Sequence, residues 1–319
     1  MLAHPTEGHV NKHLSTLLKL GVTLLGLWLS LRELDLPTLG HTLRQANLGW
    51  LLWGLLLISA SMALRAWRWS LLLRGLGIHV SFWRLVALYF VGSFFNTFLP
   101  SGFGGDVVRV LELTKEVDVD IATGTVLLDR FSGLVMLFVA ALVMLPWQAA
   151  VIPATLRWLI VGGTAVSLLI LALLLQHHLL VRLGGWLPGP LSPTGSGLLA
   201  KVLKAVQVCD RRAIGRALGV SILFNLILAG WWATTGRALA LNVPFSYYIF
   251  AVPILSIALM APSIGGLGVR ELLAPTLFAA ASLNGEQAVS LSLLVFTLER
   301  LSGLLGAPLY LLGQLQRKT

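Results

Sequence analysis

Two glycine-rich motifs, each ending in an arginine, contain the residue types that bind an anion. The first motif runs from Pro100 to Arg109 and the second from Pro262 to Arg270. In each motif a Pro-Ser pair and a glycine turn interrupt an apolar segment, and a short helix can begin after the turn. Free N–H groups at such a helix start favour an anion, and a nearby guanidinium can hold phosphate through two hydrogen bonds. We therefore predict an anion-binding site with these candidate residues: Ser101, Gly104, Gly105, Arg109, Ser263, Gly265, Gly266 and Arg270.

Two acid–base pairs lie inside apolar segments downstream of these motifs. Asp129 and Arg130 occur in the first segment, and Glu299 and Arg300 occur in the second. At a rise of about 1.5 Å per residue, each pair lies roughly 12 Å or more inside its helix. A charge at that depth in a membrane costs about 2.5–3.5 kcal/mol on insertion scales. These four charges must therefore be paired or hydrated.

Adjacent residues on a helix do not face each other, so the partners must come from other elements. Two pairings are compatible with the sequence. Either the four residues pair across the two copies, Asp129 with Arg300 and Glu299 with Arg130, or they pair with the motif arginines, Arg109 and Arg270. In both cases the charges could take part in transport, or they could only fix the register of the helices.

The composition requires a membrane environment for the whole chain. Of the 319 residues, 57% are hydrophobic and only 11% are charged, whereas soluble domains carry about 25% charged residues. This balance excludes a soluble enzyme. The net charge of +10 follows from basic loops beside apolar segments, so it does not indicate nucleic acid. The single cysteine, Cys209, excludes a disulfide framework, and no metal or nucleotide motif predicts a cofactor.

Apolar runs between charged breaks predict an all-α membrane protein that forms one domain over residues 1–319. Two of the runs, 82–99 and 246–262, end in Pro-Ser, and we expect each to turn back as a re-entrant broken-helix hairpin. An alternative in which both runs cross gives eight spans. We expect the first run to be a retained helix, because it is too long for a signal peptide. The six full transmembrane helices are predicted at 14–31, 48–64, 121–146, 156–175, 217–240 and 288–312.

The matched motifs predict an internal duplication, with repeats at about 82–146 and 246–312. Counting Lys and Arg places the basic loop 65–81, the basic segment 176–216 and both termini in the cytoplasm. In this topology the two hairpins enter from opposite faces, so the repeats are inverted, as in secondary transporters. The glycines of the motifs are also compatible with a simple packing role in membrane helices.

Two further segments carry basic residues beside apolar ones. The run from Arg65 to Trp69 alternates arginine and tryptophan after an apolar stretch, so we expect an anchor at the membrane interface. The stretch from Leu198 to Leu218 places Lys and Arg at helical spacing among apolar residues. It predicts an interfacial helix on anionic lipid.

The motifs together resemble the transmembrane region of lysylphosphatidylglycerol synthases. The resemblance rests on Arg65–Trp69, Asn96–Arg109, Asp129-Arg130-x-Ser-Gly and Pro262–Glu271, and it covers nearly the whole chain. It implies the flippase half of that family without the synthase half, because the chain stops at Thr319 after the last helix. The resemblance thus predicts a protein of the inner or plasma membrane that moves a lipid between leaflets.

Three functions stay open at this stage. The first is a flippase for an anionic or modified phospholipid, a glycolipid or a hopanoid-type lipid, with membrane lipids as its partners. The second is an integral-membrane transferase on a lipid-linked substrate, with Asp106 or Asp129 as the base or metal ligand. The third is a non-catalytic scaffold for lipid-synthesis enzymes.

Overall fold

The computed structural model describes residues 36–98, 104–148, 152–176, 197–258 and 266–315, together with Leu24, Leu25, Trp28 and Ser263. This part of the chain is helical throughout, apart from connecting turns. Within it, five helices are long and apolar enough to cross a membrane. They are α3 (Leu48–Gly75), α6 (Val119–Gln148), α7 (Ala154–Leu175), α10 (Arg211–Ala238) and α13 (Gly285–Leu304), which α14 (Gly306–Leu315) extends.

The prediction of an α-helical membrane protein is confirmed, and two helix boundaries differ from the expected ones. Helix α3 continues to Gly75 rather than ending at residue 64, and α10 begins at Arg211 rather than at residue 217. In both cases arginines that the sequence places outside the span belong to the helix. The predicted span 14–31 lies outside the described residues, apart from Leu24, Leu25 and Trp28.

Both Pro-Ser segments form hairpins. Helices α4 (Phe82–Phe98) and α5 (Gly104–Leu113) pack together. Arg84 near the start of α4 pairs with Glu112 near the end of α5 at 3.1 Å. The second hairpin consists of α11 (Phe245–Ala258) and α12 (Val269–Phe278). There the Tyr247 hydroxyl donates to the Leu277 carbonyl, which again joins the first arm's start to the second arm's end. Among the described helices, α4, α5, α11 and α12 are each shorter than the five that are long enough to cross a membrane, which favours the hairpins over the alternative with eight spans.

Helices α3 and α10 run antiparallel and are held at both ends by equivalent backbone hydrogen bonds. The Asn47 N–H donates to the Ala238 carbonyl at 2.8 Å, and the Asp210 N–H donates to the Gly75 carbonyl at 3.0 Å. Asn47 and Asp210 are 163 positions apart, as are Gly75 and Ala238. A two-fold axis across the two helices exchanges these bonds, so the repeats are inverted.

The ends of α3 and α10 repeat the same local structure. Each helix begins after a side chain that caps its first turn, Asn47 or Asp210, which satisfies an otherwise free N–H group. Two residues after each helix ends, the chain has a residue with positive φ, Gly77 at 76° and Ala240 at 55°. This conformation closes a C-terminal cap and strains a residue other than glycine. The shared local structure indicates that α3 and α10 correspond to each other, in addition to the predicted repeats at about 82–146 and 246–312.

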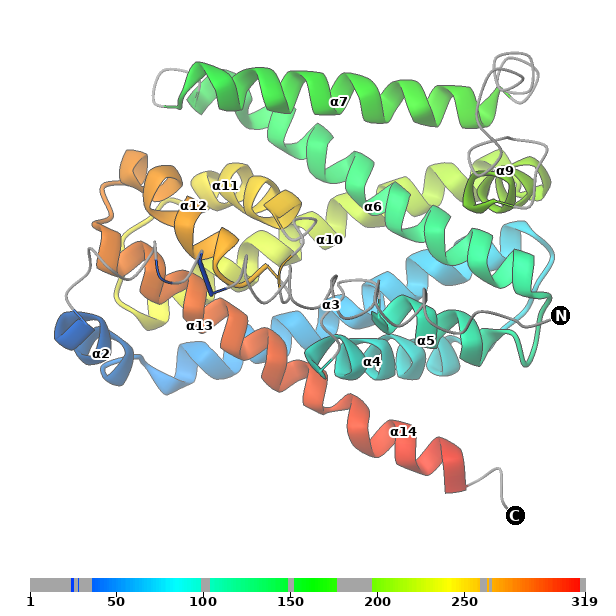
Figure 1. Ribbon diagram of the computed structural model, residues 1–319, viewed down its shortest axis with the longest axis horizontal. Helices are drawn as coiled ribbons and strands as arrows, with labels where there is room; N and C mark the ends of the chain where they lie inside the picture. The colour runs from blue at the N-terminus through cyan, green and yellow to red at the C-terminus, as the bar shows by residue number, and fades with distance from the viewer. Residues whose placement is uncertain are drawn as a thin grey trace, which may run out of the picture.

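The remaining elements of the repeats pack across the two-fold axis. Helix α4 of the first hairpin contacts α13, and α11 of the second hairpin contacts α6. The two hairpins lie toward opposite ends of the α3–α10 pair (Figure 1). The first arm of each hairpin thus packs against the long helix that follows the other hairpin, α4 against α13 and α11 against α6.

Helices outside the repeats cover the bundle. Helix α2 (Leu36–Arg44) contacts α13, and α7 packs against α6 along one side of the bundle (Figure 1). Helix α9 (Leu198–Val208) also packs on α6, where Lys201 pairs with Asp120 at 3.0 Å. The expected single interfacial helix from 198 to 218 is wrong, because the chain turns at Cys209–Asp210 and continues as α10.

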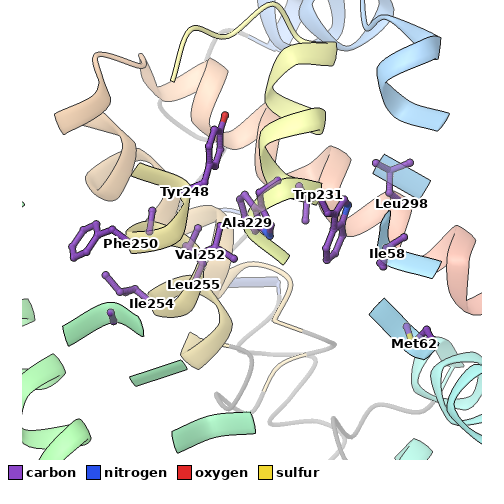
Figure 2. Close-up of a cluster of buried hydrophobic side chains, with 14 of the residues drawn as sticks. Ile58, Met62, Ala229, Trp231, Tyr248, Phe250, Val252, Ile254, Leu255 and Leu298 are labelled. Atoms are coloured by element: carbon purple, nitrogen blue, oxygen red, sulfur yellow. The ribbon is translucent and has the colours of Figure 1, made fainter. Parts of the chain in front are cut away.

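An apolar core fills the second repeat and its junction with the first. Figure 2 shows Trp231 beside Ile58 and Leu298, where α10, α3 and α13 meet. Phe278 of α12 is fully buried and stacks on Trp232 with ring centroids 6.3 Å apart. These large side chains pack the described part of the second repeat with apolar groups.

The topology predicts that the turn before α6 and the turn after α10 face opposite sides of the membrane. We expect a membrane-impermeant maleimide to label only one of the variants Asp118→Cys and Asn242→Cys in intact cells. The other variant should react only after the cells are permeabilised. Native Cys209 gives little background, because burial raises the pKa of its thiol to about 11. Labelling of both variants from one side would contradict the inverted arrangement.

The first hairpin depends on a close approach of two glycines, Gly92 and Gly105. A Cβ at Gly105 would lie 2.1 Å from the Gly92 carbonyl oxygen, so the helices must separate if Gly105 is replaced. We expect Gly105→Ala to lower stability by about 1–3 kcal/mol, measured as thermal unfolding in detergent. The matched control is Gly162→Ala on α7, where a Cβ meets nothing within 4 Å. An equal effect of both substitutions would contradict the packing.

Candidate functional site

A charged cavity lies where the first hairpin meets α3, α6 and α13. Its volume is about 90 Å³. Five arginines and three carboxylates line it, which gives an excess of two positive charges. The arginines are Arg65, Arg68, Arg109, Arg130 and Arg300, and the carboxylates are Asp106, Asp129 and Glu299. Arg300 and Glu299 come from the second repeat and the others from the first. An interior with unbalanced positive charge is suited to an anion.

Asp129 is the centre of the hydrogen bonding around the cavity. Its side chain is 1% exposed. Arg68 Nε donates to Oδ1 at 2.7 Å, and Arg109 Nη2 donates to Oδ2 at 3.1 Å. The Tyr89 hydroxyl also donates to Oδ2. Three donors from α3, α4 and α5 thus converge on one carboxylate of α6.

Arg109 contacts residues of its own hairpin, of α3 and of α6. Its guanidinium lies 3.8 Å from the ring centroid of Tyr89 and 4.3 Å from that of Trp69. Nη1 donates to Asp106 at 3.1 Å, while Nη2 is occupied by Asp129. The residue is 4% exposed. Because both terminal nitrogens already bind carboxylates, this geometry favours a role in holding the hairpin closed.

Asn96 and Asp106 connect the hairpin to the neighbouring helices. The Asn96 side-chain oxygen accepts from the Gly105 N–H at 2.7 Å, which joins the two arms of the hairpin. Its backbone carbonyl accepts from Arg300 Nη1, also at 2.7 Å. Asp106 pairs with Arg130 in addition to Arg109. The first hairpin is therefore tied both to α6 and to α13 of the second repeat.

Arg270 lies behind Glu299 and is not part of the cavity lining. Its Nη1 is 3.5 Å from Glu299 Oε2, and its Nε is 3.7 Å from Glu271 Oε1. Glu271 in turn accepts from the Gly268 N–H at 2.6 Å and from the Ser292 hydroxyl at 2.8 Å. The cation is 5.8 Å from the centroid of Trp232. Arg270 thus compensates the acids of the second repeat.

The remaining predicted site residues are divided between the two hairpins. Gly104 and Gly105 begin α5, and Gly105 lines the cavity. Gly266 has a φ of 80°, a conformation that is strained for residues other than glycine. Ser263 is 4% exposed. Ser101 and Gly265 lie outside the described residues. The structure therefore brings the first motif to the cavity and keeps Arg270 of the second motif away from it.

The predicted pairing across the copies is wrong. Asp129 contacts Arg68 and Arg109, and Glu299 contacts Arg270. The other pairing, with the motif arginines, is the one found in the structure. The physical reason is that the second arm of each hairpin, α5 or α12, packs against the long helix that follows it, α6 or α13, which places the motif arginine within reach of the acid.

Sequence reasoning missed Arg65, Arg68, Tyr89 and Asn96. The interpretation of Arg65–Trp69 as an interfacial anchor is wrong, because α3 continues for more than a turn beyond Trp69 and Arg68 is 4% exposed. One signal was present in the sequence. Arg65, Arg68 and Trp69 have the i, i+3, i+4 spacing of a single helix face, and another apolar stretch follows them.

Fold and site together define a multi-pass α-helical membrane protein, built from an inverted repeat with broken hairpins around a charged interior. The family described as the lysylphosphatidylglycerol synthase TM region matches residues 16–305. The chain belongs to this family. It is also similar to the UPF0104 membrane protein PH1989 of Pyrococcus horikoshii, with 23% identity over 284 residues, which cover 78% of this chain and 82% of that protein.

The cavity network makes a prediction about stability. Asp129→Asn leaves Arg68 and Arg109 buried without their shared carboxylate, and breaking such a pair costs about 3–5 kcal/mol. We expect a loss of that size in the free energy of unfolding in detergent. Asp118→Asn is the matched control, because Asp118 is exposed and its side chain accepts from the Asp120 N–H, a bond that the asparagine oxygen can also accept. A loss below about 1 kcal/mol for Asp129→Asn would contradict the network.

Proposed function

We propose that the protein is a lipid transporter that moves a lipid headgroup through the charged cavity, from one leaflet to the other. One observation carries this proposal: a polar cavity with excess positive charge lies inside an otherwise apolar bundle, enclosed by elements of both inverted repeats. Charges inside a membrane are costly and are typical of a substrate pathway. Family membership supports the proposal, because this membrane region is linked to lipid handling.

The candidate cargo is an anionic or modified phospholipid, a glycolipid or a hopanoid-type lipid. A headgroup needs a polar path, while its acyl chains can stay in the bilayer. The exposed apolar side chains of α7, among them Trp158, Leu159 and Leu169, provide a surface for such chains. No synthase activity is needed for this transport.

The distribution of charge supports an orientation in the cell inner or plasma membrane. The end of the bundle where α3 finishes and α6 and α10 begin carries the larger group of basic residues: Arg74, Lys115, Lys201, Lys204, Arg211, Arg212 and Arg216. The other end carries Arg44, Arg157 and Arg237. Cytoplasmic loops are enriched in Lys and Arg. We therefore propose that the first hairpin enters from the cytoplasm and that both termini are cytoplasmic.

The transferase alternative has less support from the site. Asp129 accepts hydrogen bonds from three donors and Asp106 pairs with two arginines, so both carboxylates are already engaged by groups of the protein. Glu112 and Glu116, near the end of α5, pair with Arg84, and Asp120 at the start of α6 pairs with Lys201. A scaffold does not need the cavity for its function. The translocation assay below distinguishes a scaffold from a transporter.

Transport can be measured in vesicles that contain the purified protein and a trace of fluorescently labelled phosphatidylglycerol. Dithionite destroys the label in the outer leaflet only, so a protected fraction that disappears reports translocation. We expect the wild-type protein to remove the protected fraction and the double variant Arg65→Gln/Arg300→Gln to slow its loss at least about tenfold.

The matched control for this assay is Arg157→Gln, which removes one positive charge from an exposed position on α7. It should translocate lipid at the wild-type rate. A wild-type protein that is folded but leaves the protected fraction unchanged would refute transport of this lipid and favour the scaffold.

A further inference from the structure

We infer that Arg65 and Arg300 form a subsite for the phosphate of an anionic headgroup, and that the cavity disfavours a cationic, aminoacylated headgroup. This inference deepens the proposed function and rests on it only for the identification of the ligand as a lipid. Arg65 and Arg300 differ from the arginines that the sequence predicts for anion binding, Arg109 and Arg270.

Each carboxylate of the cavity is already matched to other arginines. Asp129 pairs with Arg68 and Arg109, and Asp106 pairs with Arg109 and Arg130. Glu299 pairs with Arg270 from outside the lining. Among the residues that the structure describes, no salt bridge joins a carboxylate to Arg65 or Arg300. Counting Arg270 and its second partner Glu271 together with the lining gives six arginines against four carboxylates, again an excess of two, which is assigned to Arg65 and Arg300.

Arg65 lies in the cavity wall formed by α3, without a strong acceptor. Its Nη1 lies 3.5 Å from the sulfur of Met62, which is a weak acceptor. Its guanidinium is 5.3 Å from the ring centroid of Tyr89 and 5.4 Å from that of Phe224. These rings hold the cation in place and leave N–H groups available to a ligand.

Arg300 reaches the same cavity from the second repeat. Its Nη1 donates to the Asn96 carbonyl at 2.7 Å, and its guanidinium is 4.5 Å from the centroid of Phe296. Its Nε is buried and has no hydrogen-bond partner among the residues that the structure describes. Helices α3 and α13 are joined close by, through the Ser59 and Ser302 hydroxyls at 3.4 Å. Arg65 and Arg300 thus approach one cavity from helices of different repeats.

A phosphate diester matches this arrangement in charge and in hydrogen bonding. It carries one negative charge and several acceptor oxygens, while guanidinium groups supply donors only. A headgroup esterified with lysine adds two ammonium groups, and these would face the arginines without a free carboxylate to receive them. Like charges at close range in a protein interior repel strongly. The cavity should therefore distinguish headgroups by charge.

The inference is tested by binding, which needs no movement between leaflets. The protein is placed in phosphatidylcholine nanodiscs and titrated calorimetrically with short-chain phosphatidylglycerol, with the lysyl ester of the same lipid, and with inorganic phosphate. We expect phosphatidylglycerol to bind at least about tenfold more tightly than its lysyl ester. Arg65→Gln and Arg300→Gln should each weaken phosphatidylglycerol binding at least about tenfold.

Controls separate loss of charge from loss of fold. Arg65→Lys and Arg300→Lys keep the charge and should restore most of the affinity, and Arg157→Gln should bind as the wild type does. Binding of inorganic phosphate with the same arginine dependence would also support the subsite and would identify phosphate itself as the recognised group. Wild-type affinity in both glutamine variants, or equal affinity for the lysyl ester, would overturn the inference.

Translocation and binding fail in distinguishable ways. Arginine-dependent binding without translocation would refute the transporter and leave the subsite standing. Translocation that ignores the headgroup charge, with binding unaffected by the glutamine variants, would refute the subsite and leave the transporter standing.

Discussion

A charge buried in a membrane helix needs a fixed partner, and Asp129 shows how this requirement organises the bundle. Its carboxylate accepts from Arg68 on α3, Tyr89 on α4 and Arg109 on α5. Removing any one donor would leave the buried carboxylate with less compensation in a medium that cannot supply water. The hairpin, the long helix before it and the long helix after it are consequently held together by one side chain.

The two repeats share a backbone plan but differ in chemistry. Equivalent caps and hydrogen bonds fix α3 against α10. At the positions 163 residues after Arg65 and Arg68, however, the second repeat has Leu228 and Trp231, and Trp231 is buried in the apolar core. The first repeat therefore lines a polar cavity where the second packs densely. An internal duplication can in this way supply the symmetry of a transporter while one copy carries most of the recognition.

The sequence predicts the features that depend on local chemistry. Long apolar runs identify the spanning helices, and the Pro-Ser-Gly motifs identify the hairpins, because a proline followed closely by several glycines disfavours a continuous helix. The roles of Arg65 and Arg68 were missed, since an arginine after an apolar run is typical of a helix end. The partner of Asp129 lies 61 residues away in the chain. Such a contact follows from the crossing of helices, which no local pattern records.

The central claim is that the interior charges form a network around Asp129 and leave Arg65 and Arg300 for a phosphate. It is tested most directly by cryo-electron microscopy of the protein in a phosphatidylglycerol nanodisc. We predict that Arg68 and Arg109 flank the Asp129 carboxylate and that headgroup density lies between Arg65 and Arg300. An Asp129 without arginine partners, with Arg68 at the membrane surface and headgroup density elsewhere, would contradict the account.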